Sequence, residues 1–161
     1  METWESFFLG ELGAAAAFAG LIFVSLSVNQ ARILAFANIP ERGVQALITL
    51  FQVFVVAAIM LIPQQPQWLT GVQLLLAALV HLLVMTRSHR AELRNVAPEH
   101  RRHSWLATGL GQGAAWMFVV AAVLVMVRAD WIGFYVLAPA TLLSFFIAGL
   151  NAWVLLIEIN R

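Results

Sequence analysis

Four polar side chains lie inside long apolar stretches of the sequence, where their chemistry could serve transport, proton transfer or helix packing. They are the amides of Gln52, Gln112 and Asn151 and the imidazole of His81. Exposure of such groups to lipid is unfavourable, so we expect them to turn inward, toward one another or a shared cavity. Around water they would line a path for an ion or a small solute. Without water they would only bond neighbouring helices, and this is the interpretation we favour.

His81 has two further uses in principle, proton transfer and ligation of haem iron. Haem ligation by histidine usually needs a second axial ligand, and no other histidine lies within an apolar stretch. Haem held within one chain is therefore disfavoured, whereas haem shared between two protomers stays open.

Catalytic chemistry has little support in the residue types of the chain. There is no cysteine, and the nine positions occupied by lysine or arginine are all arginine. This composition excludes thiolate metal sites, cysteine nucleophiles and Schiff bases. No paired carboxylates, HExxH pattern or nucleophile–base set lies within the apolar stretches. We therefore expect no catalytic site, no cofactor and no metal site.

Two more sets of polar residues follow helical spacing. Ser25, Asn29 and Arg32 belong to the stretch GLIFVSLSVNQARIL and are spaced to share one helix face. They could line a cytoplasmic vestibule, but a hydrogen-bonded seam ending in an interfacial arginine explains them as well, and we favour that hypothesis. Ser144 and Asn151 are seven residues apart, so they lie on one stripe that must face protein or water.

The elements that carry these residues are predicted by composition. Of the 161 residues, 62% are hydrophobic and only 11% are charged, too few charges to cover the surface of a soluble domain of this size. Apolar runs long enough to cross a bilayer cover residues 8–33, 44–62, 68–85, 105–127 and 131–157. Such runs must be helical, because lipid offers no partner to a free backbone group. We predict an all-α membrane bundle of five transmembrane helices forming one domain, residues 1–161.

Arginine placement predicts the orientation of the bundle. Eight arginines fall on one side of the predicted spans and only Arg128 on the other. Positively charged loops stay in the cytoplasm, so we expect the N-terminus outside and the C-terminus inside. The basic loop 86–104 would then be cytoplasmic, with arginines placed to contact anionic lipid headgroups: Arg87, Arg90, Arg94, Arg101 and Arg102.

Small residues form a smooth patch on two of the predicted helices. Gly109 and Gly113 form a GxxxG pair in one, and Gly13, Ala17 and Gly20 share a face in the other. Small residues let helix backbones approach closely, which drives association in lipid. The patches indicate either close packing inside the bundle or self-association, with internal packing as the default expectation.

The stretch GLIFVSLSVNQARIL, followed by IPERGVQAL, resembles the first helix and following loop of many small bacterial integral membrane proteins without an assigned activity. The resemblance implies a multi-pass protein of the bacterial plasma membrane. Length and span number are also similar to the tryptophan-rich sensory translocator family, but that family's tryptophan and proline signature is not evident, so its porphyrin or sterol ligands are not carried over.

Three classes of function remain. The first is a non-catalytic subunit or modulator that acts through helix–helix contacts in the bilayer. The second is a small oligomeric channel or transporter lined by the four polar side chains, and an intramembrane enzyme ranks last. The partners we expect are the bilayer, anionic headgroups and either a second copy or another membrane protein. We expect no nucleic-acid partner.

Overall fold

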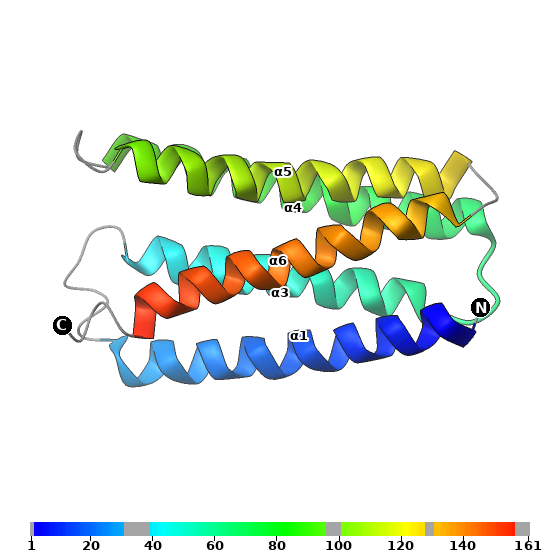
Figure 1. Ribbon diagram of the computed structural model, residues 1–161, viewed down its shortest axis with the longest axis horizontal. Coiled ribbons are helices and arrows are strands. Elements are labelled where there is room, and N and C mark those ends of the chain that lie inside the picture. The colour runs from blue at the N-terminus through cyan, green and yellow to red at the C-terminus, as the bar shows by residue number, and fades with distance from the viewer. Residues whose placement is uncertain (1, 31–38, 96–100, 128–130, 157–161) are drawn as a thin grey trace.

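The computed structural model describes residues 2–30, 39–95, 101–127 and 131–156, and this part of the chain is an all-α bundle (Figure 1). Every helix contains a segment long and apolar enough to cross a membrane. The fold class is confirmed at that level. The helices are α1 (Glu2–Val28), α3 (Ile39–Met60), α4 (Gln67–Asn95), α5 (Arg101–Val127) and α6 (Ile132–Leu156).

The helices extend beyond several of the predicted apolar spans, and the predicted basic loop is wrong. Residues 86–104, expected as a basic loop, are largely helical, because α4 continues to Asn95 and α5 begins at Arg101. The sequence after Thr86 contains arginine, alanine, glutamate and leucine, which form helices readily, and the first proline is Pro98. The first helix begins at Glu2 instead of Phe8, and residues 31–33, its expected end, lie outside the described residues.

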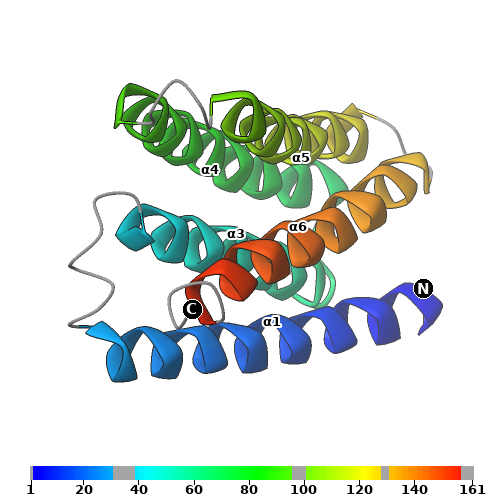
Figure 2. The same cartoon turned by 60° about the vertical axis from the view of Figure 1, so that its left-hand side comes forward.

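Successive helices run in opposite directions (Figure 1). The start of α1, the turn between α3 and α4, and the end of α5 share one end of the bundle, here called the turn end. The other end, the arginine end, contains the end of α4 and the starts of α3 and α5. α4 and α5 pair on one side, α1 and α3 lie on the other, and α6 crosses between them (Figure 2).

The core of the bundle is built from small side chains. Half of the buried apolar residues in the described part of the chain are alanines, including Ala15, Ala57, Ala78, Ala121 and Ala140. Larger groups fill the spaces between them, with Phe8, Phe118 and Leu137 in one cluster with these alanines. Because alanine leaves backbones close together, the helices gain packing along most of their length.

The α3–α4 turn is fixed by its own side chains. Gln64 occupies the left-handed region with φ of 56°, which reverses the chain after α3. The amide of Gln65 donates to Gln73 at 3.2 Å, and the Thr70 hydroxyl donates back to Gln65 at 3.0 Å. Gln67 donates to the carbonyl of Val125 at 2.9 Å, so the start of α4 is tied to the end of α5.

Three glycines allow close contacts between helices, two of them with a neighbouring backbone and one with a side chain. A Cβ atom at Gly71 would lie 2.5 Å from the Cα of Met126, so α4 meets the last turns of α5 there. At Gly133 it would lie 2.9 Å from the backbone nitrogen of Val125, where α6 packs on α5. At Gly111 it would lie 2.8 Å from the imidazole of His89 on α4.

The glycines singled out in the sequence are different ones, and the expectation that they pack inside the bundle is wrong. A Cβ atom at Gly13, Gly20, Gly109 or Gly113 would meet nothing within 4 Å. All four glycines and Ala17 are exposed. The smooth patches therefore face outward. They can serve in helix packing only if another molecule contacts them.

The contact at Gly71 should dominate the stability of the α4–α5 pair. We expect Gly71→Ala to lower the free energy of unfolding by about 1–3 kcal/mol, because the added methyl group meets backbone atoms that have no room to move. Denaturant unfolding of the purified protein in detergent measures this loss. Gly109→Ala is the matched control and should hold or raise stability, by up to about 1 kcal/mol, because alanine favours the helix. Equal effects at the two glycines would contradict this packing.

Candidate functional site

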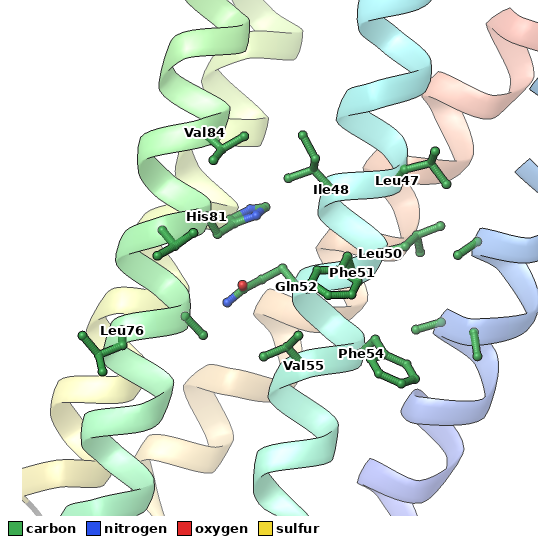
Figure 3. A pocket seen from close by; sticks show the side chains of 15 residues that line it. Leu47, Ile48, Leu50, Phe51, Gln52, Phe54, Val55, Leu76, His81 and Val84 are labelled. Carbon is green, nitrogen blue, oxygen red and sulfur yellow. The ribbon is translucent and has the colours of Figure 1, made fainter. Parts of the chain in front are cut away.

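A groove of about 780 Å³ lies over the outward face of α3. Leu47, Leu50 and Phe54 lie on the side toward α1, whereas Ile48 and Val55 lie toward α4 (Figure 3). The α4 wall adds apolar side chains, and Gln52 and His81 bring the only polar side chains among the lining residues. The groove is therefore an apolar surface with one polar spot.

The polar spot consists of two side chains from different helices. Gln52 on α3 and His81 on α4 both extend into the gap between the helices, from opposite sides (Figure 3). Their exposed fractions are 5% and 4%. Neither Gln52 Nε2 nor His81 Nδ1 has a hydrogen-bond partner among the described residues. The back of the His81 ring meets the edge of Phe118, with ring centroids 6.0 Å apart. Two buried polar atoms thus meet at one place and bind nothing in the described chain.

The gap between α3 and α4 follows from the packing of α4. Although a short turn joins these helices, α4 lies closest to α5, where Gly71 meets the backbone of Met126 and Gly111 makes room for the His89 side chain. The His81 ring also packs against Phe118 on α5. The same close contact that stabilises α4 therefore leaves its other side open toward α3.

Gln112 belongs to a different polar cluster, between α4 and α5. Its amide nitrogen lies 3.0 Å from Nδ1 of His89 and 3.2 Å from Oγ1 of Thr86, and the Thr86 hydroxyl also donates to the Leu82 carbonyl at 2.6 Å. His89 is buried at this helix interface, although it belongs to the segment 86–104 that the sequence predicts to be a loop. The signal that could have found it is its spacing, eight residues after His81 on a continuing helix.

Asn151 and Gln45 lie near the arginine end, in a third place. A small cavity of about 40 Å³ is lined by Asn151 and Gln45 together with His89 and Arg42. The Gln45 amide donates to the Ser88 hydroxyl at 3.1 Å, which bonds α3 to α4. Of the four polar residues expected to share a cavity, Gln52 and His81 therefore meet, whereas Gln112 and Asn151 lie elsewhere.

The polar residues of the first and last helices mostly satisfy themselves. Ser25 donates to the Leu21 carbonyl at 2.8 Å, and Asn29 donates to the Ser25 carbonyl at 3.1 Å. Ser144 is fully buried and donates to the Ala140 carbonyl at 2.8 Å. Each bond stays within one helix, so these residues form neither a vestibule nor the expected seam with a neighbouring helix. Arg32, the third member of the first set, lies outside the described residues.

A buried carboxylate escaped the sequence analysis. Glu11 on α1 has an exposed fraction of 5%, and its carboxyl group lies beside Thr141 on α6. Glu11 Oε2 has no hydrogen-bond partner among the described residues, and the Thr141 hydroxyl donates to the carbonyl of Ala138 at 2.8 Å. The available signal was its depth, since at 1.5 Å per residue Glu11 lies roughly 10 Å along α1 from Trp4.

The arginines expected to contact anionic headgroups lie on two helix ends that meet. Arg87, Arg90 and Arg94 lie in the last turns of α4, and Arg101 and Arg102 begin α5. Arg87 and Arg90 are exposed, which leaves their guanidinium groups open to an outside partner. No group of three or more metal-binding side chains lies close together within the described ranges.

Comparisons of the chain with protein-family models, curated proteins and solved structures find no match.

The Gln112 cluster should couple α4 to α5 energetically. We expect Gln112→Leu to lower the free energy of unfolding by about 0.6–2 kcal/mol, because the partly buried bond to Thr86 between α4 and α5 is lost. In a double-mutant cycle with Thr86→Val, the double variant should lose less than the sum of the single losses.

The measurement is denaturant unfolding in detergent, and Ser27→Ala is its control. Ser27 is exposed and donates to a carbonyl of its own helix at 2.9 Å, so its loss should stay within about 0.5 kcal/mol. Strictly additive losses for Gln112→Leu and Thr86→Val would contradict the coupling.

Proposed function

We propose that the chain is a multi-pass integral membrane protein of the bacterial plasma membrane, with its N-terminus outside and its C-terminus in the cytoplasm. Five helices of sufficient length and apolarity support the proposal. All arginines within the described ranges lie at the arginine end, which the positive-inside rule assigns to the cytoplasm. Arg32, Arg128 and Arg161 lie outside those ranges.

Reporter fusions test this topology. A fusion at Gln65, in the α3–α4 turn, should report the outer side, and a fusion after Asn95, at the end of α4, should report the cytoplasm. The reason is that the arginines of α4 resist translocation. Replacing Arg87, Arg90 and Arg94 by glutamine should weaken this preference, because it removes three of those charges. A cytoplasmic signal from Gln65 would overturn the orientation.

We propose further that the protein acts without catalysis, as a subunit or modulator that associates with other helices in the bilayer. One observation carries this proposal, namely that the GxxxG face of α5 points outward with open space beside both glycines. Trp116 and Val120 lie on the same exposed face of α5. This face therefore combines a smooth glycine surface, which another helix can approach closely, with larger apolar side chains that can pack against it. Close approach of backbones is a main source of helix association in lipid.

A channel lined by Gln52, His81, Gln112 and Asn151 has less support. These residues divide among a groove over α3, the α4–α5 interface and a small cavity near the arginine end. A water path through one copy would have to join the groove to the other two places, which share His89, across a core of alanine and larger apolar side chains. A channel would therefore require an oligomer in which the pore is lined by other faces of the helices.

The exposed arginines of α4 supply a second contact, to anionic lipid. Arg87 and Arg90 lie at the arginine end, where headgroups of the cytoplasmic leaflet would meet them. Each such arginine contributes about 1 kcal/mol near an anionic surface. This contact would hold the arginine end at the headgroup level while the α5 face stays free for a partner.

The association proposal predicts that bulk on the α5 face blocks self-association and leaves the fold intact. Gly109→Leu and Gly113→Leu should each convert oligomers to monomers, because the side chain would hold two backbones apart. Light scattering in detergent measures the particle mass, and thermal unfolding checks the fold.

Leu21→Phe is the control for added bulk. Leu21 is exposed on α1, which lies on the other side of the bundle from α5, so its replacement should leave an oligomer formed through α5 unchanged (Figure 2). A wild-type protein that is monomeric at every concentration, or oligomers that survive both glycine replacements, would overturn self-association through this face.

A further inference from the structure

We infer that the groove over α3 binds a membrane-soluble, largely apolar molecule whose polar group is an uncharged oxygen, held between Gln52 and His81. The inference is independent of the association proposed through α5, because it rests on a different face and on different residues. The walls determine the apolar body of the ligand, and the two buried side chains determine its polar group.

The polar spot has the hydrogen-bonding capacity for one oxygen atom. Gln52 Nε2 can only donate, so the ligand must supply an acceptor. His81 Nδ1 donates or accepts according to its tautomer, so it can meet a carbonyl or a hydroxyl. Both atoms are buried without a partner, and they face the same gap from opposite helices. A single oxygen between them would satisfy both.

The remaining lining residues define the rest of the ligand. Apart from Gln52 and His81, every side chain along the groove is alanine, valine, leucine, isoleucine or phenylalanine. No charged side chain is among them, so a phosphate, carboxylate or ammonium group would enter without a counter-ion. The volume of about 780 Å³ lies within the usual range for small-molecule sites.

Simpler occupants satisfy only part of the groove. A lipid acyl chain would cover the apolar walls but offers no acceptor to Gln52. A water molecule would serve the two polar atoms but leaves the walls uncovered. A long apolar molecule with an uncharged oxygen satisfies both, and long-chain ketones, quinones and alcohols share this chemistry.

The sequence offers a matched pair of glutamines to test the site. Gln45 and Gln52 are seven residues apart on α3, so they lie on one face, and both are buried. Gln45 already donates to Ser88, whereas Gln52 Nε2 has no partner among the described residues. Replacement by leucine should therefore remove an internal bond at position 45 and a ligand contact at position 52.

The experiment uses the full chain in lipid nanodiscs and three probes with one carbon skeleton: a long-chain methyl ketone, the matching secondary alcohol and the alkane. Probe retained beyond empty nanodiscs, measured by mass spectrometry across concentrations, gives the binding curve. We expect saturable binding of an oxygen-bearing probe, and affinity at least tenfold weaker for the alkane. A preference for the ketone means that both side chains donate, and a preference for the alcohol means that His81 accepts its proton.

The variants locate the bound oxygen. Gln52→Leu and His81→Leu should each weaken binding of the oxygen-bearing probe about tenfold, the effect of one lost hydrogen bond. Their unfolding should resemble that of the wild type, because each removes an unpartnered group. His81→Asn, which keeps a donor near the position of Nδ1, should restore part of the affinity. Gln45→Leu should lower stability and leave binding unchanged.

Three results would overturn the inference. The first is the absence of saturable binding for both oxygen-bearing probes. The second is equal binding of the alkane, which would make the groove a seat for acyl chains alone. The third is binding that survives both leucine replacements, since the oxygen would then lie elsewhere.

Discussion

The bundle depends on contact between backbones at the turn end, where α5 is held between two glycines. Gly71 on α4 and Gly133 on α6 face the last turns of α5, and neither position has room for a single methyl group. In a chain whose helices are apolar almost all round, the hydrophobic effect does not select which faces meet. Shape selects them instead, and these two glycines supply the closest fit. The alanines of the core extend the same close packing along the remaining length of the helices.

The groove over α3 is a consequence of the close packing of α4 on α5. Because α4 lies against α5, it stands away from α3, although only a short turn separates the two helices along the chain. The bond from Gln45 to Ser88 joins α3 and α4 near the arginine end, and the Gln65 bonds close the turn end. Between these two ties the helices stay apart, and Gln52 and His81 face the gap. The gap between α3 and α4 is therefore closed by hydrogen bonds near both ends of the helices and is open in the middle, at Gln52 and His81.

Hydrophobicity predicted the five helices, because the length of an apolar run and the need to bond every backbone group leave few alternatives. The orientation of the glycine faces was not predicted correctly. A GxxxG spacing indicates a smooth helix face, but it does not indicate whether that face lies inside or outside the bundle. Gly71 carried no such spacing, and only its neighbour Met126 reveals its role. His89 was missed because a run of charged residues suggested a loop, while good helix formers continued α4. The meeting of Gln52 with His81 depended on the lateral order of helices, which periodicity does not contain.

The burial of Glu11 beside Thr141 has a consequence for biosynthesis. Glu11 lies on the first helix and Thr141 on the last, so the carboxylate leaves the ribosome long before Thr141 exists. At about 5–20 residues per second, the interval is on the order of ten seconds. During it, α1 carries a carboxyl group within an apolar segment with no α6 to receive it, and an isolated carboxylate is costly there. The nascent α1 helix would therefore reach its final position in the bilayer only after α6 has been synthesised. The first helix to be made would then be among the last to pack into the bundle.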